Sequence, residues 1–307
     1  MKISVISPVY LAENIIEELV KRVSEVVEKL STDFEIILVD DCGPDNSWEV
    51  IQQQTKKFPF VKGIRLSRNF GQHNAITAGI SKASGDYVVL MDCDLQDDPI
   101  HINELVEKVK EGYSIVYTKR VGRKHSFWKR FTSRVYNGLF RFIANKDFDI
   151  RVGSLVIFSK QVGQEFLKLE EKDKLYIQAL KWLGFKNTII DVEHRERFEG
   201  KSSYTLRKLL SMAVQGLISN SERLLYLSIK IGIGFSILAV LAIGYIVYLS
   251  IFKVDFSPGW PSIISVIGLC TGLILICMGI LGIYIGKIIK EVRKRPNYII
   301  DQEINFK

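Results

Sequence analysis

The chain has 307 residues, of which 47% are hydrophobic, enough for one α/β domain and a further apolar segment. Its net charge of +8 matters less than where the charges lie. Its four cysteines show no metal-type spacing and its four histidines do not cluster, which disfavours a disulfide framework and a zinc site.

Strand-like and helix-like segments alternate through the first 117 residues. Short β-branched runs predict strands at 3–7, 34–39, 61–66, 87–91 and 114–117, and amphipathic segments predict helices at 13–30, 47–57, 74–83 and 100–111. Two more strands are predicted at 155–158 and 188–192, around helical stretches. This alternation predicts an α/β fold with a mostly parallel sheet and helices on both faces.

Polar clusters follow three of these strands. They are Pro8-Val9-Tyr10, Asp40-Asp41 and Asp92-Cys93-Asp94. Ligands of such sheets bind beyond the carboxyl ends of the strands. The chain has no Gly-x-Gly-x-x-Gly and no Walker A loop, which favours a nucleotide site built from acids and a metal over a dinucleotide or P-loop site.

The densest acidic cluster lies at residues 92–98. Its carboxylates repel one another at a strand end unless they are neutralised: Asp92, Asp94, Asp97 and Asp98. A hard cation such as Mg²⁺ or Mn²⁺ does this with oxygen ligands, and both Asp92 and Asp94 can reach one ion if the chain turns there. For Asp97 and Asp98, helix-capping acids in a solvated loop are an equally good interpretation.

Two later segments are basic. Residues 119–146 hold nine Lys or Arg and no acid, with aromatic residues between them. Apolar positions at helical spacing predict a helix at about 128–142, lying at a membrane interface on anionic lipid; a core-packed helix is the alternative, and nucleic acid is disfavoured. The loop 194–204 suits a phosphate, with plain surface charge as the alternative. A second amphipathic helix is predicted at 206–218.

Two apolar stretches, 231–252 and 256–286, contain no charged residue. Each exceeds the about 20 residues that a membrane-spanning helix needs. They therefore predict a transmembrane hairpin, with a buried helix pair as the alternative. No signal peptide is apparent at the start, and basic residues follow the second stretch, so we expect both termini in the cytoplasm.

Together the motifs resemble a known family. They are Pro8-x-Tyr10, Val39-Asp40-Asp41-x-Gly43-x-Asp45, Ser67-Arg68-Asn69-Phe70-Gly71-Gln72, Asp92-x-Asp94-Leu95-Gln96-Asp97 and Arg197-x-x-Gly200-Lys201-Ser202. In this order they are similar to the family 2 glycosyltransferases that act on polyprenyl phosphates, over nearly the whole chain.

The resemblance implies a GT-A domain at 1–203, a juxtamembrane helix at 204–228, two transmembrane helices at 229–289 and a basic cytoplasmic tail at 290–307. It implies a nucleotide sugar as donor, most simply a UDP-sugar, undecaprenyl phosphate as acceptor, and a homo-oligomer, tetramers included. It also implies a place in the bacterial inner membrane with the catalytic domain in the cytoplasm.

The resemblance further implies roles for single residues. Those that would hold the nucleoside are Pro8, Tyr10, Glu13, Asp40 and Asp41. The metal would be held by Asp92, Asp94 and Gln96. The residues that would meet phosphates of donor or acceptor are Arg120, Arg123, Arg197, Lys201 and Ser202.

Two segments depart from the family pattern. Leu11-Ala12 replaces a frequent Asn-Glu, and Ser154 stands where many relatives carry an Asp proposed as catalytic base, with Val156 in place of an Arg. A phosphate acceptor has a second pKa of about 6 and is already ionised at neutral pH, so positioning can replace a base. We therefore expect an inverting transfer of one sugar to undecaprenyl phosphate. A non-catalytic lipid-phosphate-binding relative is the alternative, and a processive polysaccharide synthase is a weaker one.

Overall fold

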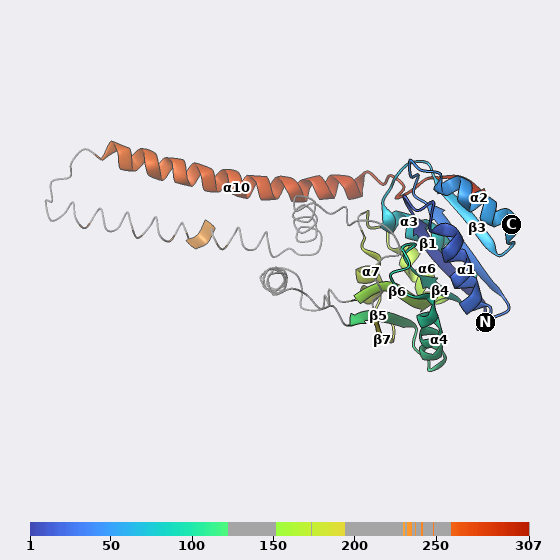
Figure 1. Ribbon diagram of the computed structural model, residues 1–307. Helices are drawn as coiled ribbons and strands as arrows, with labels where there is room; N and C mark the ends of the chain where they lie inside the picture. The colour runs from blue at the N-terminus through green and yellow to red at the C-terminus, as the bar shows by residue number, and fades with distance from the viewer. Residues whose placement is uncertain are drawn as a thin grey trace. The chain divides into compact units, whose positions relative to one another are not determined.

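The computed structural model describes residues 1–121, 152–172, 174–193 and 259–306, together with 230, 232–234, 237, 241 and 248 (Figure 1). The chain forms two units. The first contains residues 1–126, 149–202 and 295–307, and the second contains 127–148 and 203–294. The predicted helices at 128–142 and 206–218 and the predicted loop at 194–204 lie outside the described residues.

The first unit is built on one eight-stranded sheet in the order β7-β5-β6-β4-β1-β2-β3-β8. The strands are β1 Ile3–Val9, β2 Phe34–Asp40, β3 Val61–Leu66, β4 Tyr87–Leu90, β5 Ile115–Val121, β6 Val152–Ser159, β7 Asn187–Glu193 and β8 Ile300–Ile304. The pairs β1–β2, β1–β4, β2–β3 and β5–β7 are parallel, whereas β6 runs antiparallel to β4 and β5, and β8 runs antiparallel to β3. The predicted α/β fold with a mostly parallel sheet is confirmed.

Helices cover both faces of this sheet. They are α1 Ile16–Val27, α2 Ser47–Lys57, α3 Gln72–Lys82, the short 3-10 helix η1 Pro99–His101, α4 Ile102–Lys110, α6 Lys160–Lys168 and α7 Tyr176–Trp182. In α1 the buried residues fall on one stripe, because Ile16, Leu19, Val20, Val23 and Val27 recur at helical spacing. That stripe is what makes this segment a helix packed on the sheet.

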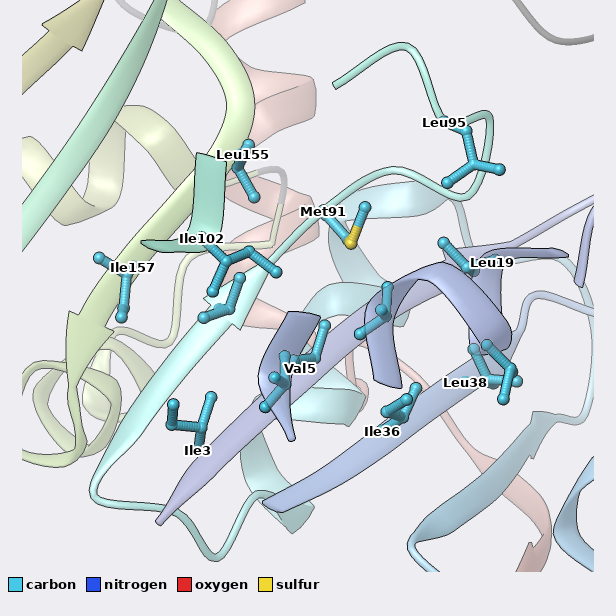
Figure 2. Packing of buried hydrophobic residues seen from close by; sticks show 14 of the residues in the cluster. Ile3, Val5, Leu19, Ile36, Leu38, Met91, Leu95, Ile102, Leu155 and Ile157 are labelled. Atoms are coloured by element: carbon cyan, nitrogen blue, oxygen red, sulfur yellow. The ribbon is translucent and has the colours of Figure 1, made fainter. Parts of the chain in front are cut away.

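Successive residues of the central strands enter different cores. In β2, Ile36 and Leu38 pack with α1, α2 and α4, whereas Ile37 and Val39 pack with α3, α6 and α7. Figure 2 shows the first core, where Ile36 and Leu38 meet Leu19 of α1 and Ile3 and Val5 of β1. A strand buried on both faces is apolar throughout, and this holds the carboxyl ends of the strands at one edge of the sheet.

The order of the central strands reverses at β1. The chain moves from β1 through β2 to β3, then α3 crosses back, and β4 pairs with the other side of β1. Helix α3 packs closely on β1, because a Cβ on Gly79 would lie 2.4 Å from Ile6 Cγ2. Ligands of open α/β sheets bind at such a reversal, beyond the carboxyl ends of the strands.

The end of the chain is part of the sheet, although residues 290–307 were predicted only as a basic tail. Strand β8 closes the edge beside β3, and Gln302 accepts a hydrogen bond from Trp48 Nε1 at 3.1 Å. The Asn305 amide donates to the carbonyls of Thr55 and Val61, both at 2.9 Å. The last residues therefore belong to the first unit.

The second unit contributes α10, Trp260–Val292, which coincides with the second of the two predicted membrane spans. Most residues of the first predicted span lie outside the described part. A span needs about 20 consecutive apolar residues in a helix. Among the described residues no helix meets the requirements of length and apolarity for crossing a membrane, so the predicted transmembrane hairpin is not supported.

Candidate active site

The loops that follow β1, β2 and β4 lie together where the strand order reverses. Each holds a residue other than glycine with positive φ: Leu11 at 52°, Cys42 at 53° and Leu95 at 53°. Such a backbone is costly for residues with a Cβ and is found where surrounding contacts enforce it, often at functional sites. The three loops are therefore held in unusual conformations at the edge where a ligand is expected.

Hydrogen bonds join the loops after β1 and β2 to each other. Glu13 Oε2 accepts from Asn46 N at 2.9 Å, and Asp45 Oδ2 accepts from Glu13 N at 3.2 Å and from Ser47 Oγ at 2.6 Å. The Ser47 hydroxyl in turn accepts from Ala12 N at 3.1 Å. These bonds explain why the helix α1 begins at Ile16 and not at the predicted residue 13: residues 12 and 13 hold the neighbouring loop.

The loop after β1 exposes two large side chains to solvent. Tyr10 and Leu11 are 46% and 58% exposed, although both are large apolar residues next to a buried strand. Gly43 lies beneath them, and a Cβ there would come within 2.7 Å of Asp45 Oδ1 and 3.4 Å of Leu11 N. An exposed aromatic ring beside backbone groups is a suitable surface for a nucleoside base.

The acids at the end of β2 are buried and bonded to the protein itself. Asp40 accepts a hydrogen bond from Gly43 N at 3.3 Å, and Arg65 Nε lies 3.5 Å from its other oxygen. Burial raises the pKa of Asp40 to about 6, against the opposing effects of Gly43 N–H and the Arg65 charge. A carboxyl group whose pKa is raised toward neutrality by burial occurs more often at functional sites than at structural ones.

Asp41 joins β2 to the loop that precedes α3. Its two carboxylate oxygens accept from Phe70 N at 2.7 Å and Gly71 N at 2.9 Å. Burial raises the pKa of Asp41, and these two amides oppose that rise. Gly71 has φ 91°, a conformation that its lack of a Cβ allows, so the motif residues Phe70 and Gly71 are explained by this contact. Contact of Asp40 and Asp41 with a nucleoside stays a prediction.

The acids after β4 differ in their roles. Asp92 Oδ1 accepts from Gln72 Nε2 at 2.6 Å, and Asp94 Oδ1 accepts from Gln96 N at 3.2 Å, a bond that turns the chain after β4. Asp98 caps the short helix η1 by accepting from Ile100 N at 3.0 Å, which confirms the capping alternative for this residue. Between the first two acids, Cys93 is partly buried, and desolvation together with the charges of Asp92 and Asp94 raises the pKa of its thiol to about 12.

Ser154 lies beside this acidic loop. Its hydroxyl donates to Asp97 Oδ2 at 2.7 Å, and its backbone carbonyl accepts from Tyr176 OH at 3.3 Å. The Tyr176 ring lies 5.6 Å from that of His73, whose pKa is lowered by burial. Ser154 stands at the position where many relatives carry an Asp. In this chain that position lies next to the carboxylate of Asp97, which is 3% exposed.

Of the predicted phosphate-binding residues, only Arg120 lies in the part of the chain that the structure describes. Arg120 lies on β5, and Arg123, Arg197, Lys201 and Ser202 lie outside the described residues. Sequence reasoning assigned no role to Gln72 or Asp45, although both stand in quoted motifs. It missed Tyr176 altogether, since a single aromatic residue on a helix gives no signal of the strand that it will contact.

The described part of the chain contains no group of three or more His, Cys, Asp or Glu that is placed to hold a metal ion. Asp92 and Asp94 supply two carboxylates, and one of them is already oriented by Gln72. Mg²⁺ is commonly bound by one or two carboxylates together with substrate phosphates and water. The two acids therefore fit a cation that is completed by a diphosphate better than one enclosed by protein.

Comparison with known proteins agrees with this geometry. Residues 4–166 match Glycosyl transferase family 2. An uncharacterised glycosyltransferase of Bacillus subtilis (strain 168) is 35% identical over 300 residues, covering 97% of this chain and 93% of the relative. The undecaprenyl-phosphate 4-deoxy-4-formamido-L-arabinose transferase of Enterobacter sp. (strain 638) is 31% identical over 310 residues, covering 99% and 94%.

A solved structure has the same fold. It is glucosyl-3-phosphoglycerate synthase from Mycobacterium tuberculosis in complex with Mn²⁺, UDP and glucosyl-3-phosphoglycerate. Its TM-score is 0.51 at 18% identity, covering 71% of this chain and 77% of that chain. This likeness confirms the predicted GT-A fold of the sheet domain. Together with the family match and the full-length relatives, it leads to one conclusion: the chain belongs to glycosyl transferase family 2 and is a glycosyltransferase.

Proposed function

We propose that this glycosyltransferase moves one sugar, with inversion, from a nucleotide donor to undecaprenyl phosphate at the cytoplasmic face of the bacterial inner membrane. The observation that carries the proposal is the acidic loop after β4, placed at the reversal of strand order in a GT-A sheet. Relatives that match over nearly the full chain are named for transfer to undecaprenyl phosphate.

The donor's nucleoside is assigned to the joined loops after β1 and β2. Tyr10 offers an exposed ring, Pro8 lies opposite Val39 near the end of the β1–β2 ladder, and Glu13 and Asp45 hold the loop in shape. A rigid, preformed surface lowers the entropy cost of binding a nucleoside. Asp40 and Asp41 support this surface from below, since both bind backbone amides of neighbouring loops.

The donor's diphosphate is assigned to the acidic loop, where Asp92 and Asp94, with Gln96 beside them, would hold Mg²⁺ or Mn²⁺. A bound cation neutralises the negative charge that develops on the departing nucleoside diphosphate. Gln72 restrains Asp92, and the turn at Gln96 restrains Asp94, so neither carboxylate must be ordered at the moment of binding. Arg120, Arg123, Arg197, Lys201 and Ser202 are proposed to meet phosphate groups of donor or acceptor.

The acceptor needs no base on this proposal. A phosphate monoester loses its second proton with a pKa of about 6, so its attacking oxygen is already anionic at neutral pH. Positioning of that oxygen opposite the leaving group then supplies the rate. Ser154, which cannot act as a base while it donates its proton to Asp97, is consistent with this chemistry.

Membrane association and assembly are proposals of the same kind. A lipid acceptor requires the site to reach the headgroup level, and the basic segment 119–146 has the charge to bind anionic lipid. Fusing a reporter after Lys307 tests the cytoplasmic placement of that end, and an external signal there would contradict it. Crosslinking in membranes tests the homo-oligomer.

The transfer itself is tested with purified protein, undecaprenyl phosphate, Mn²⁺ and a panel of UDP- and GDP-sugars. We expect one radiolabelled sugar per lipid with one donor of the panel. Binding of undecaprenyl phosphate without any transfer would favour the alternative, a non-catalytic lipid-phosphate-binding relative. Products with many sugars per lipid would favour the processive synthase.

A further inference from the structure

Ser154 and Asp97 form a short contact between two elements of the site. Ser154 belongs to β6 and Asp97 to the loop after β4, and their oxygens lie 2.7 Å apart. An O–H···O⁻ bond of this length is charge-assisted and stronger than one between neutral groups. Asp97 is 3% exposed, so little water competes for its carboxylate.

The pair lies next to the proposed diphosphate site. Strand β6 runs antiparallel to β4 with Leu90 opposite Val156, two residues from Ser154, and the acidic loop follows the end of β4. The Tyr176 hydroxyl holds the backbone carbonyl of Ser154. The Ser154 side chain is therefore fixed against Asp97, in the same loop as Asp92 and Asp94.

The direction of the hydrogen bond decides what Ser154 can do. A serine hydroxyl has one proton and two lone pairs. Its proton is given to Asp97, so toward any further group the Ser154 oxygen is an acceptor. A phosphate oxygen carries no proton to give at neutral pH, whereas a sugar hydroxyl does.

A carboxylate at residue 154 would not suit this surrounding. It would lie within hydrogen-bond distance of Asp97, and two carboxylates so close cannot both be ionised. A serine avoids that repulsion and keeps an oxygen at the same place.

We propose that Ser154 and Asp97 act as one unit that reads the donor sugar, with Ser154 Oγ accepting a hydrogen bond from one sugar hydroxyl. Asp97 is the positioning residue that orients the Ser154 proton, and Ser154 is the residue that determines specificity. The inference rests on the proposed function, because it needs a nucleotide sugar in this site.

The test measures donor binding by calorimetry with Mn²⁺ and without acceptor. The probes are UDP-glucose, UDP-N-acetylglucosamine and GDP-mannose, then the monodeoxy analogues of whichever binds most tightly, and the matching nucleoside diphosphate. In the wild type, one monodeoxy analogue is expected to bind about ten- to a hundredfold more weakly than its parent, because it lacks the hydroxyl that would donate to Ser154 Oγ.

Four variants separate reading of the sugar from support of the fold. Ser154→Ala should bind the parent and that analogue equally, while its affinity for the nucleoside diphosphate is unchanged. Asp97→Asn should reduce the difference in affinity between the parent donor and its analogue. The double variant should lose no more of that difference than Ser154→Ala alone, because effects of two coupled residues are not additive. Ser154→Thr keeps the hydroxyl and should restore the discrimination. Ser159→Ala, at the other end of β6, is the matched control and should behave as the wild type.

Two results would overturn the inference alone: full discrimination in Ser154→Ala, or an equal loss of affinity for the sugar nucleotide and the nucleoside diphosphate. A wild type that binds none of the nucleotide sugars would instead overturn the proposed function, and the inference with it.

Discussion

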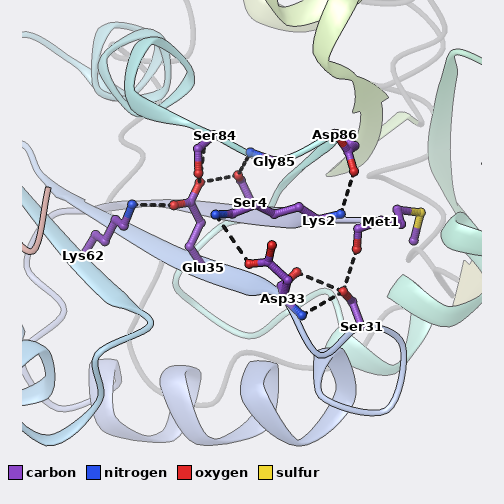
Figure 3. A network of polar contacts seen from close by, with 10 residues as sticks. All are labelled: Met1, Lys2, Ser4, Ser31, Asp33, Glu35, Lys62, Ser84, Gly85 and Asp86. Atoms are coloured by element: carbon purple, nitrogen blue, oxygen red, sulfur yellow. Dashed lines mark hydrogen bonds and ion pairs between the residues drawn. The ribbon is translucent and has the colours of Figure 1, made fainter. Parts of the chain in front are cut away.

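Strand β2 carries a buried carboxylate near each end, and the two are treated differently by their surroundings. Glu35, near the amino end, accepts hydrogen bonds from Ser4 Oγ at 2.5 Å and from Ser84 N at 2.7 Å, and Lys62 Nζ lies 2.6 Å from its second oxygen (Figure 3). Burial would raise the pKa of Glu35, but these partners outweigh it and the pKa is lowered. Asp40, at the carboxyl end, has longer contacts and a raised pKa.

The contrast distinguishes Glu35, an acid that stabilises the fold, from Asp40, an acid of the candidate site. At the amino end the bonds from Ser4 and Ser84 and the Lys62 charge outweigh the lost hydration of the carboxylate, so its charge stabilises the folded state. At the carboxyl end the replacement is incomplete, and the acids there are restrained without being neutralised. A site that must receive an incoming cation, phosphate or sugar needs such groups.

The largest expected effect is on activity, at the carboxyl end. Asp94→Ala removes a carboxylate from the proposed cation site, and we expect transfer to fall more than about a thousandfold. Asp92→Ala should behave similarly, and EDTA should abolish transfer by the wild type. The matched control is Asp98→Ala, which removes an acid of the same loop that caps η1. Full activity in EDTA would exclude the metal.

The next effect is on stability, at the amino end. Glu35→Gln leaves the Lys62 ammonium without its carboxylate, and we expect a loss of about 1–3 kcal/mol in the free energy of unfolding. Because the pKa of Glu35 is lowered on folding, its contribution is present above its unfolded pKa and is lost as the pH falls through the folded value. Denaturant unfolding at pH 7 and pH 3 measures both. Transfer per folded molecule should stay unchanged. A loss of transfer would contradict the assignment of Glu35 to stability and not to the site.

A smaller effect of opposite sign is expected for Asp40→Asn. The raised pKa, about 6, means that ionised Asp40 opposes folding above that pH and costs nothing below about pH 4, where both states bind the proton. The amide keeps an acceptor for Gly43 N, so the variant should be about 1–2 kcal/mol more stable than the wild type at pH 8. That gain should vanish at pH 4. Asp86→Asn, at the amino end, is the control and should show no such gain.

The smallest effect is expected for the rate with Ser154→Ala. If the acceptor attacks without a base, this variant should lose only about tenfold in transfer, from the lost sugar contact. The rate of both proteins should rise with pH through the ionisation of the lipid phosphate near about 6. A loss above about a hundredfold, roughly 2.7 kcal/mol of barrier, would show that the hydroxyl takes part in the chemistry.

The sequence predicts the sheet well and the contacts of the site poorly, for a physical reason. Strands such as β1 and β2 are buried on both faces, so their apolar runs are visible locally. The bonds from Asp41 to Phe70 and from Ser154 to Asp97 join residues 29 and 57 apart in the sequence, and no local pattern encodes such pairs. Strand β8 was not predicted from the sequence for a similar reason, because a charged five-residue edge strand has no apolar run.

The late position of β8 has a consequence for the order in which the protein is made. Asn305 binds the carbonyl of Val61, 244 residues earlier in the chain. At a synthesis rate of about 5–20 residues per second, β3 waits roughly 10–50 seconds for the strand that covers its edge. An uncovered edge strand invites pairing with other chains, and natural sheets discourage this with charged residues. Lys62 and Arg65 of β3 supply such charges, so pairing of β3 with other chains is disfavoured until β8 has been synthesised.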